Sequence, residues 1–241
     1  MRRVILTTVV ALLVVSSGCV GLITGETVAF EANNATVEDE ALSSTDYELN
    51  NSSTQSLTRN VEFFGQERTI RVVNQVQRYT SNGSLADIAD NETMENNETL
   101  ANNETLRDAA ANETGGDGEV AGLKRFVVVS SPGATVAGQS LNPAASWSNE
   151  RILEQVADQT GQLNDLESDG NRTVESLGEE REVSAFNATT QIKGREVEVR
   201  AHVVSFEHEG DVVIAVAVHP AEIDEQDNVD ELIGGIEHSG S

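Results

Sequence analysis

The residue pattern with the most evident chemistry in this chain is Asn-x-Ser/Thr, the acceptor sequence of N-linked glycosylation. It occurs ten times in 241 residues, whereas the 19 asparagines would give about three copies by chance. Half of the copies fall within residues 82–112, which favours occupancy of at least one of those sites in an exported chain. The alternative is that repeat expansion in an Asn-, Thr- and Glu-rich loop multiplied one incidental match. The candidate acceptors are Asn34, Asn50, Asn51, Asn82, Asn91, Asn97, Asn103, Asn112, Asn171 and Asn187.

The only cysteine follows a leader-like N-terminus. Met1-Arg2-Arg3 is basic, and residues 4–15 form an apolar run. That run is shorter than the about 20 residues needed to cross a bilayer, and it is typical of a signal peptide. The small residues of Ser16-Ser17-Gly18-Cys19 are similar to a lipobox. We therefore expect residues 1–18 to be a signal peptide and Cys19 to be the site of lipidation.

Two other interpretations of this leader stay open. It could be a signal peptide of the non-lipoprotein type followed by an incidental cysteine, or an uncleaved anchor. The Arg2-Arg3 pair also resembles a twin-arginine signal, so the export route is not fixed by the sequence. With a single cysteine, no intramolecular disulfide is possible.

Four histidines could supply a general base or metal ligands. A hairpin around Glu209-Gly210 would make His202 and His219 diagonal neighbours, about 7–8 Å apart on a shared face. Two imidazoles need a closer approach and a third ligand to share a zinc ion, so we expect a structural pair and no metal site. His208 lies six strand residues from His202, ~20 Å away, and cannot join this pair.

Familiar catalytic motifs are missing from the sequence. It contains no G-x-S-x-G, no Walker loop and no H-E-x-x-H, and a single cysteine leaves no partner thiol. We therefore assign no catalytic residue and expect no cofactor.

The charge balance is strongly acidic. The chain has 41 acidic and 15 basic residues, a formal net charge of −26. Removing residues 1–18 would take away Arg2 and Arg3, so the mature chain would carry −28. Such a chain repels nucleic-acid phosphates, which excludes a nucleic-acid binder. Acids spread along the chain are typical of a surface adapted to high salt; the alternative is an acidic patch for a cationic partner.

The N-terminal half is expected to contain a tether, a short helix and a hairpin. Residues 19–35 read as a lipidated tether. Thr36-Val37-Glu38-Asp39 fits a capping pattern and predicts a short helix to about Ser43. Residues 57–64 and 68–80 then predict two strands of a hairpin, because apolar side chains recur at period two.

Residues 81–119 differ in composition from the rest of the chain. They contain ten acids, one base and no aromatic residue. Met94, Leu100 and Leu106 recur every six residues, a spacing that steps about 120° around a helix and never forms one apolar stripe. We expect a disordered, polar, low-complexity insert.

The C-terminal half predicts a helix and several strands. Ser148 is a good helix N-cap and Gly161 a natural stop. Trp147 and Ile152 would then form a hydrophobic staple; the alternative is that Trp147 is an aromatic platform for a ligand. Strands are expected at 123–131, 171–177, 181–192, 195–208 and 211–219. Two-residue turns at Lys193-Gly194 and Glu209-Gly210 would connect the last three strands.

The last strand is apolar on both faces, which indicates a central position in the sheet. A stripe of Val229, Leu232, Ile233 and Ile236 then predicts a final helix. Short connections between strands favour antiparallel pairing. We therefore expect one α+β domain over residues 36–241, interrupted by 81–119, with an antiparallel sheet of about six to seven strands and two main helices.

Several short motifs follow one another in a recognisable order: Gly18-Cys19, Phe30-Glu31-Ala32, Ser131-Pro132, Asn142-Pro143, Ser148-Asn149, Val174-x-x-Leu177-Gly178, Val183-x-x-Phe186-x-Ala188, His202-Val203, His208-Glu209-Gly210-Asp211, His219-Pro220 and Asp224-Glu225-x-x-Asn228-Val229-x-x-Leu232. This order resembles an uncharacterised family of haloarchaeal lipoproteins, domain of unknown function 6517. The resemblance covers nearly the whole chain except residues 81–119. It implies a cell-surface lipoprotein of salt-loving archaea and brings no catalytic residue. The arrangement is also loosely similar to PsbP-like domains, a fold analogy alone.

These observations predict an exported lipoprotein, anchored by lipid at the extracellular face of the membrane. We expect a non-catalytic binding or interaction module, with an unidentified protein or small-molecule partner and no nucleic acid. The alternative is a cell-surface hydrolase or metal-dependent enzyme. Carboxylates converging on His202 and His219 in a pocket would favour the enzyme, and an open face or groove would favour the binding module.

Overall fold

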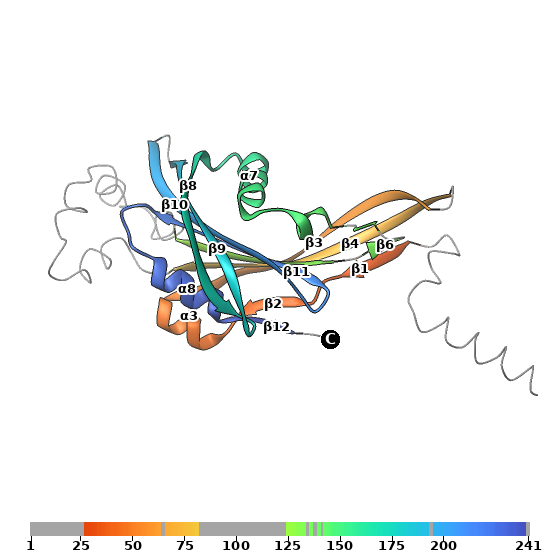
Figure 1. The fold of residues 1–241 in the computed structure, drawn as a ribbon, viewed down its shortest axis with the longest axis horizontal. Helices are drawn as coiled ribbons and strands as arrows, with labels where there is room; N and C mark the ends of the chain where they lie inside the picture. Colours follow the sequence, from red (N-terminus) through yellow and green to blue (C-terminus); the bar gives the residue numbers. More distant parts are fainter. Residues whose placement is uncertain are drawn as a thin grey trace, which may run out of the picture.

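An eight-stranded sheet organises the chain (Figure 1). The computed structural model describes residues 27–63, 66–81, 124–133, 135–136, 139–140, 142–192 and 195–239. Along the sheet the order is β1-β4-β5-β11-β10-β9-β8, and β3 pairs with β4. These strands are β1 (Val28–Glu31), β3 (Tyr47–Phe63), β4 (Gln66–Ser81), β5 (Arg125–Pro132), β8 (Asn164–Ser176), β9 (Glu179–Ile192), β10 (Arg195–His208) and β11 (Asp211–Pro220).

Smaller elements surround this sheet. Two short ladders are formed by β2 (Asn34–Val37) with β12 (Ile236–Ser239), and by β6 (Thr135–Val136) with β7 (Gln139–Ser140). The α-helices of the described residues are α3 (Asp39–Thr45), α7 (Asn149–Thr160) and α8 (Gln226–Gly234), and the 3-10 helix η2 spans Pro143–Ser146. Within the described residues, no helix is long and apolar enough to span a membrane.

The α+β class is confirmed, but the expectation of an antiparallel sheet was wrong. The sheet is mixed, because β1 runs parallel to β4, with Val28 opposite Ile70. β5 pairs only with residues 75–80 of β4, so β1 supplies partners for the same edge at residues 70–73. An unpaired strand edge leaves hydrogen-bonding groups open, and β1 covers this one. The described fold therefore starts at Val28 and not at residue 36.

Two helix boundaries in the structure also differ from those predicted from the sequence. Thr36 lies in β2, and α3 begins after Glu38, whose side chain makes no capping hydrogen bond. At the C-terminus, α8 ends at Gly234, and Ile236 begins β12 instead of extending the helix. Ile236 remains buried, because the strand turns its side chain into the same core as the helix stripe.

The hairpin turns follow the sequence closely. Ile192 pairs with Arg195, and His208 pairs with Asp211, as two-residue turns require. Glu209 and Gly210 both have positive φ, 48° and 88°. Such φ values match the twist of a two-residue hairpin and favour glycine at the second position.

Helices cover both faces of the sheet, with α7 on one side and α3 and α8 on the other (Figure 1). Alternation along the strands divides their side chains between two cores. The α7 core contains Ile152, Leu153, Ala157, Leu163, Phe186, Ala188, Val197, Val199, Ala201 and Val203. The α8 core includes Tyr47, Tyr79, Phe126, Val128, Val183, Val204, Phe206, Val213, Val229, Leu232 and Ile233.

Several predictions fall on residues outside the described part of the chain. These are the signal peptide at 1–18, Cys19, the insert from residue 82 to 119, and the acceptors Asn82, Asn91, Asn97, Asn103 and Asn112.

Candidate functional site

A pocket forms where β9 separates from β10. The two strands pair from Ile192–Arg195 as far as Ser184–Val203, and the ladder ends there. The N-terminus of α7 lies over the gap, and the resulting pocket has a volume of about 520 Å³. The backbone groups of β9 that precede Ser184 therefore need hydrogen-bond partners other than β10.

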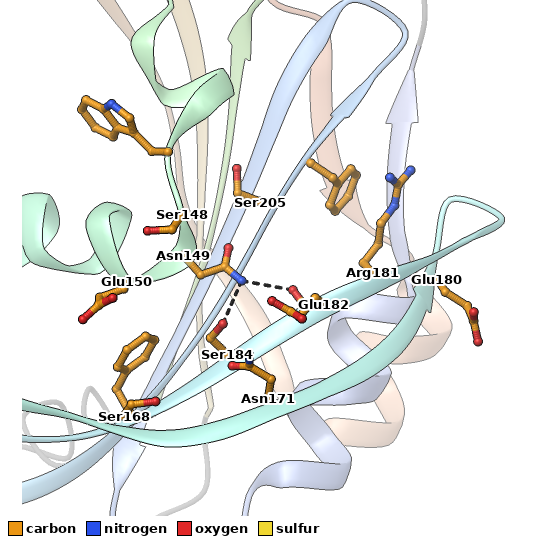
Figure 2. A pocket seen from close by; sticks show the side chains of 13 residues that line it. Ser148, Asn149, Glu150, Ser168, Asn171, Glu180, Arg181, Glu182, Ser184 and Ser205 are labelled. Atoms are coloured by element: carbon orange, nitrogen blue, oxygen red, sulfur yellow. Dashed lines mark hydrogen bonds between the residues drawn. The ribbon is translucent and has the colours of Figure 1, made fainter.

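Asn149, the first residue of α7, supplies one of those partners. Its Nδ2 donates to the Glu182 carbonyl oxygen and to Ser184 Oγ, each at 3.1 Å (Figure 2). The preceding residue, Ser148, accepts a hydrogen bond from the Arg151 backbone N–H at 3.3 Å and caps the helix. The predicted N-cap is thus confirmed, and the helix start is fixed directly over the pocket.

The pocket lining is rich in hydroxyl and amide groups. Figure 2 shows these side chains on α7, β8, β9 and β10 around one space. Three carboxylates and a single basic side chain give the lining a negative balance, which disfavours an anionic ligand. The lining residues are Trp147, Ser148, Asn149, Glu150, Ser168, Asn171, Glu180, Arg181, Glu182, Ser184, Phe186, Ser205 and Phe206.

Arg181 forms part of the far wall of the pocket. Its guanidinium carbon lies 4.3 Å from the centroid of the Phe206 ring, and its Nη2 is 2.8 Å from Glu179 Oε2. The flat cation on an aromatic face is a favourable contact that keeps the side chain in place. The wall therefore combines an aromatic ring, a fixed charge and neutral hydrogen-bonding groups.

Trp147 lies at the other side of the lining. It packs against the α7 core that contains Ile152, and the guanidinium carbon of Arg151 lies 5.1 Å from its ring centroid. The contact with this core agrees with the predicted staple. Because Trp147 also lines the pocket, the staple and ligand-platform interpretations are compatible.

The predicted histidine pair lies on the other face of the sheet, toward α8. His202 Nε2 and His219 Nε2 are 3.0 Å apart, and the rings stack at 13° with centroids 5.2 Å apart. This approach is closer than their diagonal backbone positions suggest, because both side chains lean toward each other. Arg172 Nη1 lies 2.9 Å from His202 Nδ1, and the Pro220 carbonyl oxygen lies 2.9 Å from His219 Nδ1.

These partners assign the protons of both rings. The Pro220 carbonyl only accepts, so His219 carries its proton on Nδ1 and offers a lone pair at Nε2. His202 then donates from Nε2 and accepts from the Arg172 guanidinium at Nδ1. Arg172 Nε in turn donates to Asp230 Oδ1 on α8 at 2.7 Å. The result is one continuous chain of hydrogen bonds from α8 to β11.

Both imidazoles of this pair are held neutral. His202 and His219 are 2% and 1% exposed. Burial lowers the pKa of His202 to about 3, and the nearby charge of Arg172 adds to the effect. Burial also lowers the pKa of His219. Neither histidine is among the residues that line this pocket.

A second buried polar group lies at the start of α8. Glu225, 3% exposed, forms an ion pair with Lys124 and accepts a hydrogen bond from Asn228 Nδ2 at 3.1 Å. Burial raises the pKa of Tyr47, and its hydrogen bond to Glu225 raises it further. The three partners compensate the cost of burying the carboxylate.

The glycosylation candidates on described strands differ in accessibility. Asn34, Asn50, Asn51 and Asn171 are exposed, whereas Asn187 is half-buried on a strand paired on both sides. Asn34 Oδ1 accepts a hydrogen bond from Gln77 Nε2 at 2.7 Å. Asn171 lines the pocket, so a glycan there would stand at its edge.

Sequence reasoning missed several residues of these sites. No spacing rule brings Arg172 and Asp230 to His202, because the three residues lie on separate elements. His238 is likewise far in sequence from the neighbours His208 and Glu209, and the metal-ligating atoms of these three residues lie within 4.8 Å of one another. The only available signal was the rarity of histidine in the chain, which marked each one for inspection.

The chain is an α+β protein with a mixed sheet, helices on both faces and a polar pocket at a strand divergence. Residues 34–237 match the family described as Domain of unknown function (DUF6517), and the chain belongs to that family. No curated protein matches the sequence. Among solved structures, a protein of unknown function from Pseudomonas aeruginosa, PA94, is similar at 15% identity, covering 48% of this chain and 75% of that one, with a TM-score of 0.27.

Proposed function

We propose that this protein is an exported, lipid-anchored surface protein of a salt-adapted archaeon, and that its folded part is a non-catalytic binding module. The anchor proposal rests on the leader and Cys19, and the salt adaptation on the net charge of −26. The loose PsbP-like resemblance contributes nothing to the proposed activity.

The pocket between β9 and β10 carries the binding proposal. Its volume of about 520 Å³ suits a small molecule. Residues of the described chain with shifted pKa values, such as His202, His219 and Tyr47, are not part of its lining. A lining without such groups favours binding over acid–base catalysis.

The lining chemistry favours a neutral, hydroxyl-rich ligand such as a saccharide. Ser168, Ser184, Ser205 and Asn171 offer donors and acceptors in one space, and Trp147 offers an aromatic edge. Hydroxyl groups can both donate and accept, so they match such a lining without needing a compensating charge. The excess of carboxylates disfavours phosphorylated or carboxylated ligands.

Saturation-transfer NMR with a panel of neutral mono- and oligosaccharides, in molar KCl, tests this proposal. Binding should be lost in Ser205→Leu, which fills the pocket, and retained in Ser56→Leu, an exposed serine on β3. Binding that is equal in the two variants, or a preference for anionic sugars, would reject the pocket as the saccharide site.

One observation favours the alternative of a metal-dependent enzyme. His208, Glu209 and His238 bring three metal-ligating atoms close together at the other end of β10 and β11 from the histidine pair.

A further inference from the structure

Two histidines and a glutamate meet at the turn between β10 and β11. His208 ends β10, Glu209 lies in the turn, and His238 comes from the C-terminal strand β12. One ligand atom from each lies within 4.8 Å of the others. The rings of His208 and His238 stand edge to face, with centroids 5.3 Å apart.

His238 is oriented by a neighbouring carboxylate. Its side chain is fully buried, and its Nε2 lies 3.1 Å from Asp211 Oδ2. A carboxylate accepts, so the proton of the neutral ring is on Nε2 and Nδ1 keeps its lone pair. Within the described residues, Nδ1 makes no hydrogen bond, and Glu209 Oε2 lies 3.8 Å from it. A buried nitrogen without a hydrogen bond is rare and costly.

We propose that His208, Glu209 and His238 bind one divalent metal ion of the zinc class, and that Asp211 positions His238 for it. Two imidazoles and one carboxylate form a donor set that suits zinc, with a fourth position left for water. The arrangement Asp211–His238–metal is a carboxylate–histidine–metal triad, in which the outer carboxylate fixes the ring tautomer.

The spacing of the donors fits an ion after a small closure. Metal–ligand distances of about 2.0–2.1 Å place tetrahedral donors about 3.3 Å apart. The Nδ1 of His238 and Oε2 of Glu209 are 3.8 Å apart, and the Glu209 side chain is 56% exposed. Rotation of that exposed side chain can bring Glu209 Oε2 to this distance from His238 Nδ1, and the three ligand atoms already lie within 4.8 Å of one another.

The backbone around the site is fixed from several sides. His208 pairs with Asp211 across the turn, and the Gly133 N–H donates to the Gly210 carbonyl at 2.8 Å. The Asn33 N–H donates to Asp211 Oδ2 at 2.8 Å, so the positioning carboxylate is itself held. Preorganised donors of this kind are what a binding site requires.

Cobalt titration of the mature chain in molar KCl tests the site, after removal of metals with a chelator. One equivalent of Co²⁺ should give the visible bands of a tetrahedral ion, and Zn²⁺ should displace it. His238→Gln and His208→Gln should each abolish the bands. Asp211→Asn should weaken binding by about 10–100-fold, the usual effect of removing an outer carboxylate.

Controls separate this site from general binding by an acidic surface. Glu207→Gln and Glu237→Gln each remove an exposed acid beside a proposed ligand, and both should retain the bands. The proposal is overturned if wild type gives no tetrahedral bands, or if His238→Gln keeps them. Circular dichroism checks folding, and if His238→Gln does not fold, the half-buried His208→Gln decides the outcome.

Discussion

His202 and His219 place their Nε2 atoms 3.0 Å apart inside the α8 core, with one ring donating to the other. Arg172 and the Pro220 carbonyl occupy the outer nitrogens, so neither ring has room for an added proton without breaking a hydrogen bond. The pair therefore links β10, β11 and α8 only while both rings are neutral.

Acid should unfold the protein through this pair. The pKa of His202 falls from 6.5 to about 3 on folding, so between these values the unfolded chain binds a proton that the native state excludes. The contribution of this ring to the free energy of unfolding is therefore complete above pH 6.5. It falls as the pH drops toward 3, by up to about 1.4 kcal/mol per pH unit. His219 acts in the same direction. Guanidinium unfolding midpoints from pH 7 to 4, at constant salt, measure the loss.

A histidine-specific readout separates this effect from the protonation of carboxylates. In His202→Gln, the slope between pH 6.5 and 5 should decrease, because most carboxylates stay ionised there. The NMR signals of the His202 ring should stay at their neutral positions down to at least pH 5. A titration midpoint near 6.5 for His202 in the native state would contradict the buried, neutral pair.

Asn149 should contribute measurably to stability by joining α7 to β9. Asn149→Ala leaves the Glu182 carbonyl without its donor and removes the bond to Ser184 Oγ. We expect a loss of about 1 kcal/mol, or a thermal midpoint lower by about 2–4 °C. Asn50→Ala, at an exposed position of β3, is the matched control and should change the midpoint by much less. Equal thermal midpoints in the two variants would show that the hydrogen bonds of Asn149 to β9 do not contribute to stability.

Folding should depend on salt. A mature charge of −28 must be screened, and the Debye length grows from ~3 Å at 1 M to ~10 Å at 0.1 M. Circular dichroism during dialysis from molar KCl to ~0.1 M should show loss of structure. If the spectrum and the thermal midpoint do not change on this dilution, the result would argue against adaptation to high salt.

The parts of the fold set by local pattern were predictable from the sequence. Residues 212–218 are apolar on both faces, and β11 does lie between β5 and β10. Ser148 and Gly161 marked the ends of α7, and Glu209-Gly210 marked a turn. Each of these signals depends only on residues a few positions apart, because the conformational preference of a residue and the spacing of apolar side chains are local properties of the sequence.

Contacts between distant segments were not predictable. The parallel pairing of β1 with β4 depends on how far β5 reaches along the same edge, which no local pattern records. His238 joins His208 because β12 pairs with β2 beside the turn, a relation fixed by packing alone. The pocket likewise depends on where the β9–β10 ladder stops.

Cys19 is expected to carry the membrane anchor. Cys19→Ser should block lipidation, so the protein would leave the detergent-soluble membrane fraction or accumulate as an unprocessed precursor. Mass spectrometry of the mature N-terminus and fractionation measure both effects. Ser17→Ala, which keeps a small residue in the motif, should be processed normally. An unchanged mass and distribution in Cys19→Ser would reject lipidation.

Residues 82–118 should be removable without unfolding the domain. The strands on either side of this segment pair with each other, because the Ser81 N–H donates to the Lys124 carbonyl at 3.3 Å and Thr80 pairs with Arg125. A short Gly-Ser link can therefore close the β4–β5 connection as a hairpin. Shortening the loop changes its closure entropy by less than ~2 kcal/mol, and the segment has few apolar groups to bury.

The thermal midpoint of this deletion variant in high salt should stay close to that of the wild type. Any mass added by glycans at Asn91, Asn97, Asn103 and Asn112 should disappear with the segment, and mass spectrometry of protein from the native host measures it. A domain of this size shifts by only ~2–4 °C per kcal/mol. A midpoint lowered by more than roughly 10 °C would therefore mean that the segment packs on the sheet and contributes several kcal/mol to its stability.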